Sequence, residues 1–165
     1  MPINFKKLAI LVIEDNQAMR DVISAVLEGL DVGRAIYARN GEQGYNKFKE
    51  FNPDIVISDW EMEPMDGIEL IRHIRKDPLS PNKMVPVIFL TGYGAPERVK
   101  TARDAGVTEF LVKPFTADKL IQRITYVINH PRDYVESKAY TGPDRRRVKK
   151  PDYQGPFRRK SDESG

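Results

Sequence analysis

The sequence predicts an α/β domain with a doubly wound, five-stranded parallel sheet, followed by a basic C-terminal tail. Five short apolar runs alternate with amphipathic stretches, a pattern typical of successive strand–helix units joined by right-handed crossovers. Three of the runs are continuously apolar, which is expected when helices cover both faces of a parallel sheet. The predicted sheet is therefore buried on both sides.

The predicted strands are the apolar runs themselves. Their boundaries are polar residues, glycines or prolines, which interrupt extended structure. In chain order the predicted strands are Leu8–Ile13, Arg34–Ala38, Ile55–Ser58, Val85–Leu90 and Phe110–Val112.

The stretches that follow these strands carry apolar residues at helical spacing. The first has its apolar residues on one stripe, with Asn16 as a candidate N-cap and Gly29 near its end. The second and third run into the proline-containing segments "NPD" and "DPLSPNK", and the fifth begins at the cap residue Thr116. The predicted helices are Gln17–Leu27, Glu42–Phe51, Gly67–Lys76, Pro96–Ala105 and Thr116–Ile128.

Length and charge favour one domain, residues 1–129, with a tail over residues 130–165. A chain of 165 residues can bury one proper core but is too short for two ordinary domains. In the tail, ten lysines and arginines face six acids, so the tail accounts for the net charge of +3. The basicity of the chain therefore says little about the domain itself.

Two further observations bear on location. The apolar run "LAILVI" ends at Glu14, which predicts neither a signal peptide nor insertion into a membrane. The absence of cysteine excludes a disulfide framework, a thiolate metal site and a cysteine nucleophile. Both observations fit a cytoplasmic protein.

Polar side chains that can bind a ligand or take part in a reaction follow four of the predicted strands. They are Glu14 with Asp15, then Asp59, Thr91 and Lys113. In open α/β sheets, ligands bind beyond the carboxyl ends of the strands, where these residues are expected to converge. Each residue alone has an ordinary explanation, such as an acid at a helix start or a turn residue. Their joint placement favours a functional site.

The chemistry of these residues indicates an aspartate that receives a phosphoryl group. Three close carboxylates repel one another unless a cation lies among them, and hard oxygen ligands open to solvent suit Mg²⁺. Lys113 can neutralise a phosphoryl oxygen or Asp59, and Thr91 offers a hydroxyl donor to the same group. Asp59 is the candidate acceptor.

Four segments in order resemble the receiver domain of bacterial two-component response regulators. The segments are "ILVIEDN", "DIVISDWEM" continuing to "MDG", "VIFLTGYG" and "AGVTEFLVKPF". The resemblance covers roughly residues 7–130. It implies a flavodoxin-like fold and a phosphohistidine donor for Asp59, either a sensor histidine kinase or a histidine phosphotransfer protein. It also implies a Mg²⁺ ion held by Glu14, Asp15, Asp59 and the backbone carbonyl of Glu61.

The resemblance further implies a switch. Lys113 and Thr91 would contact the phosphoryl oxygens, and Phe110 falls at the position of the family's aromatic switch residue. Together they would couple Asp59 to the face made by the fourth helix, fifth strand and fifth helix, which would act on an unknown downstream protein. The resemblance therefore predicts a stand-alone response regulator rather than an enzyme.

Two alternative functions require features that the sequence lacks. A phosphohydrolase that forms an aspartyl phosphate would need an Asp-x-Asp nucleophile after the first strand, where this chain has "EDN". A regulator acting through nucleic-acid binding would have to use the tail, where charge and proline replace the periodicity of a helix-turn-helix. Specific nucleic-acid binding is therefore not expected.

The tail contains an internal repeat. "YTGPDRRR" at residues 140–147 is echoed by "YQGPFRRK" at residues 153–160, which share Tyr-x-Gly-Pro-x-Arg-Arg and a third basic residue. A solvated, disordered tail is one interpretation. The other is a pair of docking segments, in which the tyrosines are anchors and the arginine pairs grip carboxylates or phosphates.

Overall fold

The computed structural model describes residues 3–92, 96–131, 134–136 and 141–143. After a short 3-10 helix, Phe5–Lys7, strands and helices alternate along the chain. The first five strands are β1 (Ala9–Ile13), β2 (Arg34–Ala38), β3 (Ile55–Asp59), β4 (Val87–Thr91) and β5 (Glu109–Val112). The helices are α1 (Gln17–Gly29), α2 (Gly41–Phe51), α3 (Gly67–Lys76), α4 (Pro96–Ala105) and α5 (Ala117–Asn129).

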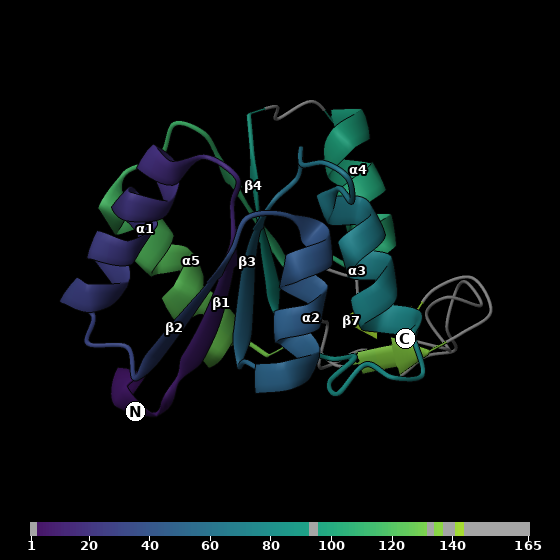
Figure 1. The fold of residues 1–165 in the computed structure, drawn as a ribbon, viewed down its shortest axis with the longest axis horizontal. Coiled ribbons are helices and arrows are strands. Elements are labelled where there is room, and N and C mark those ends of the chain that lie inside the picture. The colour runs from purple at the N-terminus through teal and green to yellow at the C-terminus, as the bar shows by residue number, and fades with distance from the viewer. Residues whose placement is uncertain (1–2, 93–95, 132–133, 137–140, 144–165) are drawn as a thin grey trace, which may run out of the picture.

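These five strands form one parallel sheet in the order β2-β1-β3-β4-β5. The chain starts near the middle of the sheet and winds first to one edge and then to the other. Helices α1 and α5 consequently cover one face, and α2, α3 and α4 cover the other (Figure 1). The predicted α/β class, with a doubly wound five-stranded parallel sheet, is confirmed. The order reverses between β1 and β3, so their carboxyl ends lie side by side.

The core consists of two apolar layers separated by the sheet. Along β1, Leu11 and Ile13 belong to the layer under α2 and α3, whereas Ile10 and Val12 belong to the layer under α1 and α5. This alternation follows from the two-residue period of a strand. All four side chains are fully buried, which explains why the run is apolar without interruption.

Element boundaries differ from the predicted ones by a few residues. Strand β4 starts at Val87 rather than Val85, since Pro86 has no N–H to donate to the sheet, although its carbonyl accepts from Val56. Helix α2 starts at Gly41 because the Asn40 side chain caps it through the N–H of Gln43.

An additional pair of strands follows α5, in a region where no strand or helix is predicted from the sequence. Strands β6 (Tyr134–Glu136) and β7 (Thr141–Pro143) pair in antiparallel fashion, and β7 lies next to α3 (Figure 1). Each strand has three residues, too few for a periodic signal. The second copy of the tail repeat lies outside the described residues, as does the first copy except for the backbone of residues 141–143.

A buried arginine on α3 joins three segments of the chain. Arg75 is fully buried and donates from Nε and Nη2 to the carbonyl of Gly106, at 3.1 and 2.8 Å, and from Nη1 to the carbonyl of Lys83 at 2.6 Å. Gly106 has a φ of +108°, a backbone conformation that favours glycine. Arg75 thereby fixes the segments that lead into β4 and β5. Within the described part of the chain, no helix combines the length and apolar character needed to cross a membrane.

Gly67, the first residue of α3, closes the loop that follows β3. Its N–H donates to the carbonyl of Trp60 at 2.8 Å, and the side chain of Asp66 caps the helix. A Cβ at Gly67 would lie 2.7 Å from the Asp59 carbonyl oxygen and 2.8 Å from Cζ of Phe89. The end of β3 and the start of α3 can therefore approach this closely only because residue 67 is a glycine and has no side chain.

Gly67→Ala is expected to lower the free energy of unfolding by about 1–3 kcal/mol, because the methyl group would meet backbone and a buried ring. Urea denaturation followed by circular dichroism measures this change. Gly29→Ala is the matched control, since a Cβ there meets nothing within 4 Å. Equal stability of the two variants would contradict the tight packing at Gly67.

Candidate functional site

Three strands of the sheet, β1, β3 and β5, bring two carboxylates and an amine together at their carboxyl ends. Glu14 directly follows β1, Asp59 ends β3, and Lys113 directly follows β5. The Nζ atom of Lys113 lies 2.8 Å from Oε1 of Glu14 and 3.3 Å from Oδ1 of Asp59. Glu14 is fully buried and Asp59 is 8% exposed, so the lysine is the countercharge to two largely buried acids.

Asp15 adds a third carboxylate to this group. One carboxylate oxygen from each of Glu14, Asp15 and Asp59 lies within 4.8 Å of the others, and Asp15 is the exposed member. The cluster exists because β1 and β3 are adjacent at the point where strand order reverses. We refer to Glu14, Asp15 and Asp59 as the acidic triad.

The electrostatics of the triad reflect its burial. Burial, and after it the neighbouring carboxyl of Asp59, raise the pKa of Glu14 to about 7, although the ammonium of Lys113 opposes both effects. Burial alone would lower the pKa of Lys113, but the hydrogen bond to Glu14 and the charges of both carboxylates outweigh it and raise that pKa. Lys113 is therefore positively charged at neutral pH.

The donor set fits a small divalent cation. The triad offers only carboxylate oxygens, which Mg²⁺ prefers, and its exposed side leaves room for the waters that this ion retains. One lysine cannot neutralise three carboxylates, so the arrangement favours a further positive charge. The acidic triad is therefore a group of residues that could hold a divalent metal ion.

Thr91 and Phe110 lie on the strands beside this cluster. Thr91 ends β4, is nearly fully buried, and its carbonyl accepts from the N–H of Lys113 at 2.7 Å. Phe110 pairs with Phe89 across β4 and β5 and packs partly buried against the layer under α2, α3 and α4. Its carbonyl accepts from Nε of Arg123 on α5 at 2.8 Å. Phe110 is therefore outside the charged cluster, and its switch role stays a prediction.

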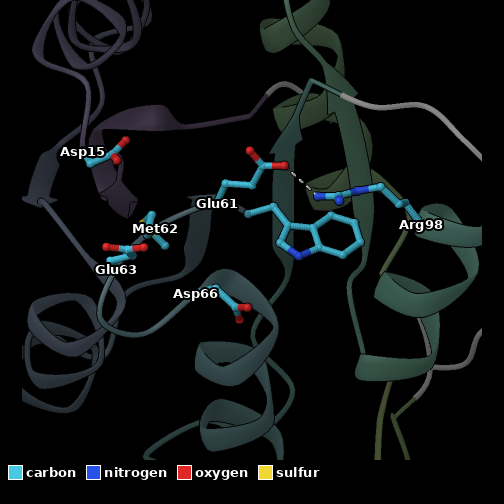
Figure 2. A pocket seen from close by; sticks show the side chains of 7 residues that line it. Asp15, Glu61, Met62, Glu63, Asp66 and Arg98 are labelled. Atoms are coloured by element: carbon cyan, nitrogen blue, oxygen red, sulfur yellow. Dashed lines mark hydrogen bonds and ion pairs between the residues drawn. The ribbon is translucent and has the colours of Figure 1, made fainter.

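The loop after β3 forms the wall of an open pocket of about 570 Å³ beside the triad (Figure 2). The backbone N–H of Trp60 donates to Oδ1 of Asp59 at 2.8 Å, which fixes the orientation of that carboxylate. The predicted ligand role of the Glu61 carbonyl stays a prediction. The pocket is lined by Asp15, Trp60, Glu61, Met62, Glu63, Asp66 and Arg98.

Arg98 also lines this pocket, although it is not among the site residues predicted from the sequence. It reaches from α4 to the loop after β3, where Nη2 lies 3.0 Å from Oε1 of Glu61 (Figure 2). Its guanidinium carbon lies 4.1 Å from the centre of the Trp60 ring. A charged residue in the first turns of an amphipathic helix gave no signal of this contact, because the partner is 37 residues away in the sequence.

Comparisons with known proteins agree with this architecture. The family described as the response regulator receiver domain matches residues 10–125. The chain is 33% identical over 123 residues to the chemotaxis protein CheY1 of Helicobacter pylori, covering 73% of this chain and 97% of that protein. It is 33% identical over 119 residues to the chemotaxis protein CheY-3 of Vibrio cholerae, covering 72% of this chain and 90% of that protein.

A solved structure shows the same fold. The chemotaxis response regulator CheY4 of Vibrio cholerae superposes with a TM-score of 0.67 at 27% identity, covering 73% of this chain and 98% of that structure. The family match spans most of the chain, including all three members of the acidic triad, the loop after β3 and Lys113. The chain belongs to the response regulator receiver domain family.

Proposed function

We propose that this chain is a stand-alone response regulator that accepts a phosphoryl group on Asp59 and thereby changes its affinity for a downstream protein. The observation that carries the proposal is the position of the Lys113 amine within 3.3 Å of Asp59 and 2.8 Å of Glu14. A permanent cation placed against a nucleophilic carboxylate is suited to the negative charge of an incoming phosphoryl group.

In the proposed reaction, a carboxylate oxygen of Asp59 attacks the phosphorus of a phosphohistidine. The P–O bond forms as the P–N bond breaks, and the electron pair of that bond returns to the imidazole of the donor. Lys113 and the hydroxyl of Thr91 would donate to the phosphoryl oxygens. Glu14, Asp15, Asp59 and the carbonyl of Glu61 would hold Mg²⁺, which supplies positive charge for the phosphoryl oxygens when bound.

Family membership supports the choice of donor and mode of action. We propose that the donor is a sensor histidine kinase or a histidine phosphotransfer protein. The match to chemotaxis proteins along nearly their whole length supports action through protein binding in the cytoplasm. We expect the chain to be an acceptor of phosphoryl groups, without turnover of small phosphate esters.

The output surface that we propose is the face of α4, β5 and α5. Thr91 and Phe110 lie on β4 and β5, between Asp59 and this face. Two large apolar side chains are partly exposed on it, Val112 at 48% and Tyr126 at 41%. Contact residues of this kind support a protein partner for the face.

Asp59→Ala is expected to abolish modification, because Asp59 supplies the nucleophile. Incubation with acetyl phosphate and Mg²⁺, followed by intact mass measurement, should add one phosphoryl group to the wild type and none to the variant. Glu63→Gln, which changes another acid of the pocket, is the control and should be modified. A modified Asp59→Ala protein would refute the assignment.

Replacing both Glu14 and Asp15 by Ala is expected to remove Mg²⁺ binding while the fold survives, since the repulsion within the triad is removed with the ligands. Trp60, the single tryptophan of the chain, follows Asp59 directly, so its fluorescence reports Mg²⁺ titrations.

Lys113→Ala should still bind Mg²⁺, at least as tightly as the wild type, because a competing cation is gone. A collapse of Mg²⁺ affinity in Lys113→Ala would contradict the position proposed for Lys113.

We also propose that the repeat in residues 140–160 docks a partner through its arginine pairs. Linked copies would gain avidity on a partner with two acidic sites. Replacing the arginine pairs of both copies, Arg145 with Arg146 and Arg158 with Arg159, by Ala should reduce capture of the proteins that the wild type retains, because bidentate contacts to carboxylates or phosphates are lost. Asp59 phosphorylation should be unchanged.

The control for the repeat replaces Lys149 and Lys150 by Ala, which removes positive charge between the two copies without changing either copy. Equal loss in both variants would indicate a general effect of positive charge, including salt-dependent attraction to nucleic acid. If the arginine variant captures as much protein as the wild type, the docking proposal is wrong and the segment acts only as a solubilising tail.

A further inference from the structure

The pocket beside Asp59 is dominated by negative charge. Among its lining residues that the structure describes, four are acids, Asp15, Glu61, Glu63 and Asp66, and Arg98 is the basic one. The largely buried carboxylates of Glu14 and Asp59 lie at the base of the same region, close to Asp15. A phosphodonor is itself an anion, so its approach to Asp59 is opposed by these charges.

Arg98 offsets one of those charges. Its Nη2 contacts Oε1 of Glu61 at 3.0 Å, and Glu61 is only two residues beyond the phosphoacceptor. Without this partner, the Glu61 carboxylate would add a full negative charge to the pocket wall. The ion pair is partly exposed, with side-chain exposures of 33% and 61%, so its contribution to folding stability is small. The positive charge of Arg98 nevertheless lowers the electrostatic repulsion that an anion meets when it enters the pocket.

The aromatic ring of Trp60 fixes the position of the guanidinium. The carbon of the Arg98 guanidinium lies 4.1 Å from the ring centre, and the Trp60 ring in turn packs 5.5 Å from the ring of Phe89 on β4. This contact is possible for a planar guanidinium and is weaker for a lysine ammonium. Arg98 is therefore held at the rim of the pocket by two residues that directly follow Asp59.

We propose that Arg98 is a positioning and specificity-determining residue for phosphoryl transfer to Asp59, which neutralises Glu61 and thereby favours phosphodonors of high negative charge. This inference rests on the proposed function of Asp59. Arg98 acts through Glu61 and through the local potential, not through a bond to phosphorus. The donors it favours are dianions such as acyl phosphates, over donors with a single net negative charge such as phosphoramidate.

The test compares these two donors with the full-length chain at low ionic strength. Arg98→Ala should reduce the apparent second-order rate constant for acetyl phosphate by about fivefold at most, and that for phosphoramidate by clearly less. The loss should diminish at high salt, because solvent-exposed charges are screened. Arg98→Lys should retain most of the acetyl phosphate rate, since it keeps the charge, but should change Trp60 emission as the stacked guanidinium is lost.

The decisive variant combines Arg98→Ala with Glu61→Gln. If Arg98 acts by neutralising Glu61, removing that carboxylate should restore the acetyl phosphate rate. A purely structural role for Arg98 predicts equal slowing with both donors and no rescue, and that result would overturn the inference. An unchanged rate in Arg98→Ala would overturn it as well.

Failure of the proposed function itself gives a different result. In that case the wild type is not modified at Asp59 by either donor, and the comparison of Arg98 variants has no signal. Modification of wild type that is lost in Asp59→Ala, together with donor-independent behaviour of Arg98→Ala, refutes the role of Arg98 alone.

Discussion

Lys113 contacts two carboxylates that reach it from different strands, Glu14 after β1 and Asp59 at the end of β3. This three-way contact requires β1, β3 and β5 to end at the same edge of the sheet, with their last residues aligned to within the length of a side chain. The continuous apolar strands satisfy that requirement, because layers on both faces hold them in place. The burial that stabilises the sheet also raises the pKa of Glu14 and makes the lysine necessary.

Much of the architecture could be predicted because it follows from local patterns. The two-residue period of apolar strands and the spacing of helical stripes are encoded in contiguous segments, so the alternating elements and the parallel sheet followed from them. The convergence of Glu14, Asp15, Asp59 and Lys113 required one more rule, that parallel strands deliver their carboxyl ends to one edge. Each of these residues stands at a strand end in the sequence itself.

The contacts that could not be predicted join residues far apart in the chain, and no sequence pattern marks these residues as partners. Arg98 meets Glu61 across 37 residues, and Arg75 meets the carbonyl of Gly106 across 31. A backbone carbonyl carries no signature in a sequence, and an arginine on a helix is ordinarily solvated. The boundary of β4 was misjudged for a related reason, since the apolar Val85 is buried but the following proline keeps it out of the ladder.

Helix α4 is attached to the rest of the domain differently at its two ends. Beyond its C-terminal end, the backbone at Gly106 accepts two hydrogen bonds from a buried arginine, in a setting from which water is excluded. Near its N-terminal end, Arg98 makes an ion pair that is open to solvent. Rupture of the first attachment leaves a buried guanidinium without those acceptors, whereas the second exchanges readily with water and ions. We therefore expect any displacement of α4 to be a rotation about its C-terminal end, with the largest movement next to the loop after β3.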